Sequence, residues 1–446
     1  MMTRKRIPAA LAAAMLLLSL AGCSSKKEEG VTVRYLNFKP EIAGKYEELA
    51  EQYEKETGVR VVVDTAANNT YEQTLTSKMA TDEAPTLFQI NGPRGYANWK
   101  DYCADLSDTQ LYKHLTDKSL AITDGNKVVG IPYVVEGYGI IYNKAITDKY
   151  FALSGRKATV GSMEEVNSFE KLRVLVEDMQ ARRQELGIAG VFASTSLKSG
   201  EDWRWQTHLM NLPVYYEFQT NKVDLTGEQV ERLAFTYADR MRAVFDLYIN
   251  NSVTDRKKLG TKTVSDSMAE FALGQCAMVQ NGNWAWSQIR DVAGNTVKAE
   301  NVKYLPIYAG MDGEENQGLC VGTENFYAIN AKATEEEQKA AADFIYWLYS
   351  SDTGKRYVVE EFGFIAPFDT FGADETPDDP LAREITRWMS KEGVTAVPWN
   401  FTLFPSAKFK EDLGASLLKY AQGGKTWDEV KADAAKSWTD EYAAIR

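Results

Sequence analysis

VTVRYLNF at residues 31–38, VRVVV at 59–63 and TLFQI at 86–90 are three β-rich stretches near the start of the chain. In the segments between them, 41–56 and 70–81, apolar residues recur at the three- and four-residue spacing of an amphipathic helix. This alternation predicts a parallel sheet with helices on both faces, in which VRVVV is a largely buried strand. Ligands of such sheets bind outside the carboxyl ends of the strands.

Length and composition limit the class of protein. The 446 residues favour more than one lobe, because single hydrophobic cores stop growing at roughly 250–300 residues. The formal net charge of −12 argues against a nucleic-acid binder, which needs a surplus of Lys and Arg. Two histidines leave few ligands for a His-rich metal site, and we expect neither a metal nor a cofactor.

Helical periodicity dominates the rest of the chain. It covers residues 169–186, 229–249, 265–273, 334–349, 408–421 and 427–444. Thr334 and Glu337 have the spacing of a capping box at the start of one of these helices. No GxSxG, HExxH or GxGxxG motif occurs, so the serine-hydrolase elbow, the zinc-protease helix and the dinucleotide fingerprint are absent.

The first 22 residues have the features of an export signal. A basic region, Arg4 to Arg6, precedes an apolar run that ends in Leu20-Ala-Gly-Cys23. The run is too short to cross a bilayer, which takes about 20 apolar residues, and it resembles a secretory signal followed by a bacterial lipobox. We therefore expect a lipoprotein signal peptide at 1–22, lipidation of Cys23, and a flexible tether at 23–29. A cleaved signal with an accidental cysteine, or a membrane anchor, are the alternatives.

Three further cysteines are Cys103, Cys276 and Cys320. An odd number cannot all pair within one chain, and the absence of a CxxC motif suggests neither a zinc ribbon nor a redox site. We expect mostly buried thiols and leave a bridge between Cys276 and Cys320 open.

Three motifs carry a family resemblance: GIPYVVEGYGIIYNK at residues 130–144, GQCAMVQNGNWAW at 274–286 and GTENFYAIN at 322–330. In this order and spacing they resemble the family 1 extracellular solute-binding proteins, the maltose-binding-protein-like sugar receptors of ABC importers. The chain departs from the family at Pro85-Thr86, where Pro-Asp is usual, and at Val321-Gly322, where Gly-Gly is usual.

The resemblance implies an α/β fold of the type II periplasmic-binding-protein kind, with two α/β lobes, three inter-lobe crossings and a ligand cleft between the lobes. Lobe 1 would comprise residues 30–134 and 307–348, and lobe 2 residues 135–306 and 349–446. The implied protein is an exported, lipid-anchored monomer on the outer face of the membrane. It would capture a carbohydrate, a di- or oligosaccharide, by lobe closure and deliver it to separate permease subunits of an ABC importer, without catalysing a reaction.

A sugar site needs flat aromatic surfaces together with carboxylates and amides that bond hydroxyls. The chain offers this mixture at loop positions and in the three motifs, and the candidates are Asn91, Glu136, Trp203, Trp205, Asn281, Trp284, Glu324, Asn325 and Trp399. Each has a structural alternative. Any of the tryptophans could be a core residue, Glu136 could pair with a nearby cation, and Asn91 could cap a turn. We interpret His208 as a structural histidine.

The sequence also leaves alternative functions open. A surface glycoside hydrolase would need two carboxylates roughly 5–10 Å apart, for which Glu136 and Glu324 are the nominees. A scaffold or adhesin without a small ligand, and a receptor of the same fold for a peptide or polyol, are further alternatives. The negative net charge fits a neutral ligand, but Arg94 and Arg204 lie close to candidate positions and leave an acidic sugar open.

Overall fold

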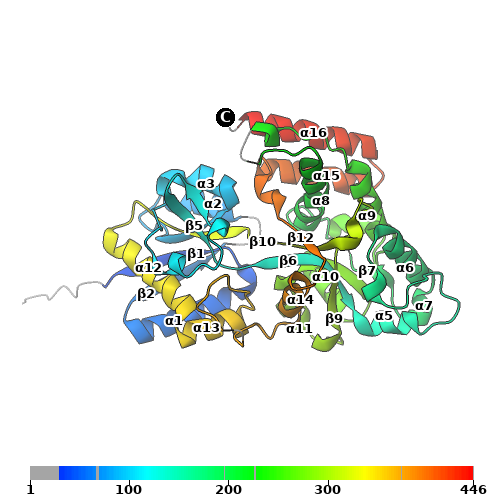
Figure 1. Cartoon of the computed structure of the whole chain (residues 1–446), viewed down its shortest axis with the longest axis horizontal. Coiled ribbons are helices and arrows are strands. Elements are labelled where there is room, and N and C mark those ends of the chain that lie inside the picture. Colours follow the sequence, from blue (N-terminus) through cyan, green and yellow to red (C-terminus); the bar gives the residue numbers. More distant parts are fainter. Residues whose placement is uncertain (1–29, 67–69, 195, 226–227, 373, 445–446) are drawn as a thin grey trace, which may run out of the picture.

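Two lobes lie side by side in the computed structural model, which describes residues 30–66, 70–194, 196–225, 228–372 and 374–444 (Figure 1). Each lobe has a mixed sheet flanked by helices. The expected signal peptide, Cys23 and the tether up to residue 29 lie outside the described residues. No helix in the described part of the chain is both long enough and apolar enough to cross a membrane.

The first sheet has the strand order β2-β1-β3-β11-β5-β4. Its strands are β1 Thr32–Asn37, β2 Arg60–Thr65, β3 Leu87–Asn91, β4 Ile122–Asp124, β5 Lys127–Pro132 and β11 Asn325–Ile329. Strand β1 pairs in parallel with β2 and β3, which confirms the arrangement predicted from the N-terminal pattern. Strand β11 arrives from far along the chain and inserts antiparallel between β3 and β5.

Strand β2 differs from the prediction. It was expected to be largely buried, but among its residues only Val61 is buried and the others are intermediate or exposed. The reason is its place in the sheet. Strand β2 pairs only with β1 and forms the sheet edge, whereas the buried strand β3 has neighbours on both sides.

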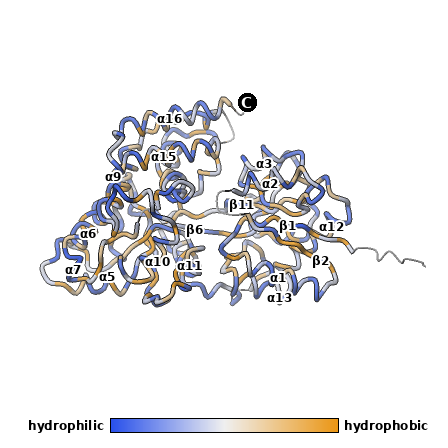
Figure 2. The backbone as a smooth tube through the Cα atoms, turned by 180° about the vertical axis from the view of Figure 1, so that it is seen from behind, coloured by the Kyte–Doolittle hydropathy of each residue, from blue (hydrophilic) through white to orange (hydrophobic). Residues whose placement is uncertain are grey.

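Helices cover both faces of this sheet, and Figure 2 shows hydrophobic segments in the middle of the lobe around β1 and hydrophilic segments on the helices outside. They are α1 Ala43–Thr57, α2 Tyr71–Met79, α3 Gly92–Trp99, α4 Gln110–Lys113, α12 Glu335–Ser350 and α13 Asp352–Arg356. The capping box predicted for α12 is present, because the Thr334 and Glu337 side chains each bond the other residue's backbone N–H.

The second sheet has the order β12-β10-β6-β8-β7, with β9 also paired to β6. Its strands are β6 Glu136–Asn143, β7 Gly190–Phe192, β8 Cys276–Gly282, β9 Val302–Leu305, β10 Gln317–Gly322 and β12 Thr395–Val397. Every residue of β6 is buried. This strand is the centre of the lobe, because β8, β9 and β10 all bond to it.

One helix of the second lobe, α9, is shorter than predicted. The helices of this lobe are α5 Lys144–Phe151, α6 Phe169–Ala181, α7 Arg183–Leu186, α8 Met210–Thr220, α9 Ala238–Asn250, α10 Val264–Ala272, α11 Trp286–Arg290, α14 Pro380–Met389, α15 Ala407–Ala421 and α16 Trp427–Ala444. The helix expected over 229–249 begins only at Ala238, because Phe235 has a φ of 54°, which a right-handed helix cannot include.

The chain passes between the two sheets three times. It leaves the first sheet after β5, returns between β10 and β11, and leaves again before α14. The lobe limits differ from those expected. Strand β10 belongs to the second sheet, although residues 307–322 were assigned to lobe 1. Beyond residue 348, Phe368 packs in the first lobe, with its ring 4.7 Å from that of Tyr349 and a backbone bridge to Leu115.

We predict that Gly139→Ala destabilises the protein by about 1–3 kcal/mol, the usual effect of overpacking. A Cβ at Gly139 would lie 2.6 Å from the Leu305 carbonyl oxygen and 2.7 Å from a Leu319 methyl carbon, so the centre of the second sheet would have to shift. Urea unfolding measures the change. Gly44→Ala is the control, because Gly44 is helical and exposed with free space around it, and we expect it to stabilise slightly. Equal stabilities of the two variants would contradict the prediction.

Candidate functional site

Aromatic side chains from separate segments of the second lobe meet near the crossings. We call them the aromatic cluster: Tyr138, Trp203, His208, Trp284, Trp399 and Phe401. The His208 ring lies flat on Tyr138, with ring centroids 4.1 Å apart and an interplanar angle of 11°. Trp284 lies 5.5 Å from His208, 5.8 Å from Trp203 and 6.5 Å from Trp399. The cluster therefore presents several aromatic rings within a small volume.

Two glycines allow the indoles to take these positions. A Cβ at Gly282 would lie 2.2 Å from the Trp284 ring, and one at Gly322 would lie 2.7 Å from the Trp399 ring. Both glycines end strands of the second sheet, β8 and β10. Each indole thus lies directly on the backbone at a strand end, where any larger residue would displace it.

A π-helix, Arg204–Leu209, carries the next part of the cluster. Trp203 precedes it and contacts His208 at 4.9 Å between ring centroids. Trp205 points elsewhere, because it packs in the lobe's core at 5.6 Å from Phe245 and 5.0 Å from Tyr248. The two residues were nominated together, and the helical backbone separates them. Short π-helices are frequent at functional sites.

A buried ion pair joins the first lobe to this region. The Lys39 ammonium lies 2.5 Å from a Glu136 carboxylate oxygen and 3.8 Å from Glu41, and both Lys39 and Glu136 are buried. The same ammonium lies 5.7 Å from the Trp284 ring centroid. Burial raises the pKa of Glu136, and the Lys39 cation opposes that rise. Lys39 follows β1 and Glu136 begins β6, so the pair lies between the lobes.

The other polar candidates divide into two groups. Asn91 donates a hydrogen bond of 2.6 Å to Glu324, and Asn325 is its register partner across β3 and β11. These three residues lie together on the first lobe at the second crossing. Asn281 is fully buried beside Met268, 3.3 Å from its sulfur, and its side-chain oxygen accepts from the Gly282 N–H. Asn281 is therefore apart from the cluster.

Several polar atoms near the cluster are buried without a hydrogen-bond partner among the described residues. They are Nε1 of Trp284, Nε1 of Trp399, Nδ1 of His208, Oδ1 of Asn325 and the three guanidinium nitrogens of Arg204. Burial, followed by the charges of Arg204 and Lys410, lowers the pKa of His208 well below its usual range, so its imidazole is neutral. Unpaired polar atoms of this kind are costly unless a ligand bonds them.

Of the residues nominated from the sequence, the structure brings Trp203, Trp284 and Trp399 together, and Glu136 lines a cavity with Trp284. Sequence reasoning missed Lys39 and Phe401, and it treated His208 as purely structural. Tyr138 lies inside the motif at residues 130–144 and could have been nominated from it. Lys39 has no local signal, because only the fold brings it to Glu136, 97 residues away.

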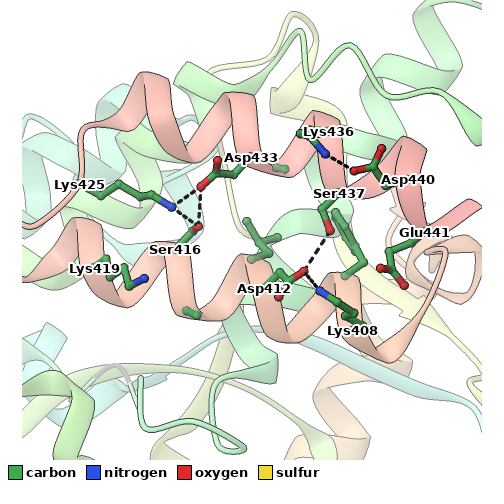
Figure 3. Close-up of a pocket in the computed structure, with 14 residues that line it drawn as sticks. Lys408, Asp412, Ser416, Lys419, Lys425, Asp433, Lys436, Ser437, Asp440 and Glu441 are labelled. Atoms are coloured by element: carbon green, nitrogen blue, oxygen red, sulfur yellow. Dashed lines mark hydrogen bonds and ion pairs between the residues drawn. The ribbon is translucent and has the colours of Figure 1, made fainter.

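The structure has two notable cavities, one between the lobes and one between two helices of the second lobe. A cavity of about 170 Å³ spans both lobes beside the cluster. It is lined among others by Glu41, Glu136, Trp284, Phe362 and Asp379. A larger groove of about 480 Å³ lies between α15 and α16, where lysines and acids pair with one another (Figure 3). Most of its charges pair within the groove, as in the Lys408–Asp412 and Lys436–Asp440 pairs.

No group of three or more His, Cys, Asp or Glu side chains in the described ranges is arranged to hold a metal ion. The three described cysteines, Cys103, Cys276 and Cys320, are free thiols. The bridge left open between Cys276 and Cys320 is not formed in the structure, in which β6 lies between their strands.

A family model of bacterial extracellular solute-binding proteins matches residues 48–384. The chain belongs to this family. The resemblance to extracellular solute-binding proteins predicted from the three motifs is thus confirmed, and the family is one of binding proteins that act outside the cytoplasm.

Solved structures confirm the two-lobed α/β fold. A chitin oligosaccharide binding protein has a TM-score of 0.69 at 20% identity, with 93% of this chain and 99% of that chain covered. A sugar transporter from Bacillus licheniformis in complex with stachyose has a TM-score of 0.66 at 16% identity, covering 93% and 100%.

A curated relative matches a smaller part of the chain. The melibiose/raffinose/stachyose-binding protein MelE of Bacillus subtilis is 28% identical over 144 residues, which is 30% of this chain. The match spans about a third of that relative's length, 34%.

We predict that Lys39→Met lowers the free energy of unfolding by about 3–5 kcal/mol at pH 8, because it leaves the buried Glu136 carboxylate without its cation. The loss should be smaller at pH 5. Without Lys39 the pKa of Glu136 rises further above its unfolded value, so the penalty is present at high pH and disappears as the carboxyl is protonated. Urea unfolding at both pH values measures it.

The double variant Lys39→Met/Glu136→Gln is the matched control and should recover most of the stability, since neither charge remains. A loss in Lys39→Met that is the same at both pH values, or that persists in the double variant, would mean that the ion pair is not its origin.

Proposed function

We propose that this protein is an exported receptor that captures a di- or oligosaccharide between its lobes and delivers it to an ABC importer. The observation that carries the proposal is the aromatic cluster, in which Trp203, Trp284 and Trp399 lie within 6.5 Å of a neighbouring indole. Indole faces suit the apolar C–H faces of sugar rings. The cluster lies on the second lobe, and Lys39 of the first lobe reaches its edge.

Polar atoms around the cluster supply the second half of a sugar site. The indole N–H groups of Trp284 and Trp399 and the side-chain oxygen of Asn325 are buried without partners among the described residues. Each can bond a sugar hydroxyl. An unsatisfied buried polar group costs about 1–3 kcal/mol, so a ligand that pairs with these groups removes a penalty that the free protein carries.

The names of the relatives support the same ligand class. MelE binds melibiose, raffinose and stachyose by its name, one structural neighbour is a chitin oligosaccharide binding protein, and another holds stachyose. We extend this class to the present chain because the aromatic cluster gives it a chemical basis. The ligand is then imported by permease subunits on separate chains, and the receptor acts as a monomer.

Several contacts hold the two lobes against each other. Besides the Lys39–Glu136 pair, the Arg94 guanidinium of α3 lies 4.5 Å from the Tyr442 ring centroid of α16. A Cβ at Gly92 would lie 2.9 Å from Thr402, so the N-terminus of α3 closely approaches the second lobe. We propose that hinge bending at the three crossings opens and closes the cleft, and that the closed pair of lobes is what the permease recognises.

Binding without chemistry is the favoured role. The two carboxylates nominated for a hydrolase already bond neighbouring side chains, Glu136 to Lys39 and Glu324 to Asn91. Glu136 is buried against the Lys39 cation, so its carboxylate is held in an ion pair and not placed to protonate a leaving group. Receptors for peptides or polyols remain outcomes of the binding test below.

We predict that a cognate oligosaccharide at 100 times its dissociation constant adds about 2.7 kcal/mol of stability and raises the melting temperature. Trp284→Ala and Trp399→Ala should each weaken binding about tenfold or more, because each removes a stacking surface and a buried donor. Thermal unfolding against neutral oligosaccharides, acidic oligosaccharides, polyols and short peptides measures both effects.

Trp347→Ala is the matched control, because Trp347 lies on α12 of the first lobe and packs on Tyr53. It should leave ligand affinity unchanged. A shift caused by peptides alone would keep the fold assignment and remove the carbohydrate, and no shift from any probe would favour a scaffold.

We also propose that Cys23 carries a lipid and that residues 23–29 tether the receptor to the membrane. Cys23→Ser should therefore move the protein from the membrane fraction to the soluble fraction of the host that exports it, with ligand affinity unchanged. Fractionation followed by immunoblotting measures this. Retention of the Cys23→Ser variant in the membrane would instead indicate an uncleaved apolar anchor.

A further inference from the structure

Arg204 is a buried cation at the wall of the aromatic cluster. It is 2% exposed, and its guanidinium carbon lies 3.9 Å from the Trp203 ring centroid. All three guanidinium nitrogens are buried without a hydrogen-bond partner among the described residues. Burial lowers the pKa of Arg204 to about 9, so the side chain is still charged at neutral pH. The Trp203 ring compensates in part by a cation–π contact, but it accepts no strong hydrogen bond.

A second cation lies nearby. Lys410 of α15 is half-buried, and both its charge and that of Arg204 act on His208. Neither Lys410 nor Arg204 forms a direct ion pair with a described residue, and the carboxylate whose charge acts on Arg204 is Glu201 of the same lobe. The acids that attract Lys410 are Glu324 and Glu72, which belong to the first lobe. Two cations that form no direct ion pair with a described residue are thus held beside the cluster in a chain whose net charge is −12.

The buried atoms that lack partners are mostly donors. Five carry N–H groups, three on Arg204 and one each on Trp284 and Trp399, whereas Asn325 and Gln280 contribute one amide oxygen each and His208 one imidazole nitrogen, Nδ1. A sugar hydroxyl can accept a hydrogen bond from one of these N–H groups, but it brings no negative charge to the buried guanidinium. A carboxylate only accepts, can take two N–H bonds from one guanidinium, and carries the charge that a buried arginine needs.

We propose that the captured oligosaccharide is acidic, and that its uronic acid carboxylate binds Arg204 while the indoles hold the sugar rings. This inference rests on the proposed receptor function and names the ligand class of the same site. Lys410 adds long-range attraction from the second lobe. The carboxylate satisfies the guanidinium on binding.

Isothermal titration calorimetry of the purified full-length protein tests the proposal. The probes are trigalacturonate, a glucuronate-substituted xylotriose and trimannuronate, each compared with its neutral counterpart, namely galactotriose, xylotriose and mannotriose. We expect at least one acidic probe to bind more tightly than its neutral counterpart by about tenfold or more. Arg204→Gln should abolish that difference, and Arg204→Lys should restore part of it.

Arg173→Gln removes one positive charge from the surface of α6 and is the control, since Arg173 pairs there with Glu170 and Glu177. It should leave the preference unchanged. Arg204→Gln should also raise the melting temperature of the ligand-free protein, because it removes an unpaired buried charge. An arginine with a purely structural role would lower it.

Two results would overturn the inference. If neutral probes bind as tightly as acidic ones, the acidic ligand is wrong and the receptor function stands. If Arg204→Gln weakens acidic and neutral probes equally, Arg204 shapes the site without reading a carboxylate. Absence of binding by every oligosaccharide, acidic and neutral, would remove the receptor function as well.

Discussion

Lys39 and Glu136 form the contact on which the placement of the two lobes depends. Lys39 follows the first strand of the first sheet, and Glu136 is the first residue of the central strand of the second. Two residues further along that strand, Tyr138 supports the His208 ring, while the Lys39 ammonium faces Trp284. One buried ion pair thereby relates the first lobe to the aromatic cluster. We expect this pair to fix the arrangement of the lobes more than it adds net stability, because desolvation offsets the attraction.

The aromatic cluster combines rigid surfaces with unsatisfied polar edges. Gly282 and Gly322 let two indoles lie on the backbone at strand ends, so their positions are set by the sheet and not by flexible loops. Arg204, Trp284 and Trp399 carry N–H groups that no described residue bonds. A free protein holding so many unpaired donors is stabilised whenever an acceptor-rich ligand enters, and binding and closure then reinforce each other.

Much of the fold could be predicted from local pattern, and the rest depended on contacts between distant segments. The strand–helix alternation predicted the parallel β1–β3 core, but the edge position of β2 depends on how the whole sheet is assembled. Trp203 and Trp205 are the same residue type two positions apart, and their side chains point in different directions because a π-helix begins between them. Lys39 could not be nominated, since its role arises from a residue 97 positions away. The lobe limits were missed for the same reason, because β10 pairs in the second sheet while its successor β11 pairs in the first.

The insertion of β11 between β3 and β5 has a consequence for how the molecule is made. The first sheet cannot close until residues 325–329 arrive, after nearly all of the second lobe's strands have been synthesised. Pairing across such sequence separation is slow, because loop closure precedes the contacts that reward it. The first lobe therefore stays incomplete until most of the polypeptide has been made, and we expect it to complete its fold together with the second lobe and not ahead of it.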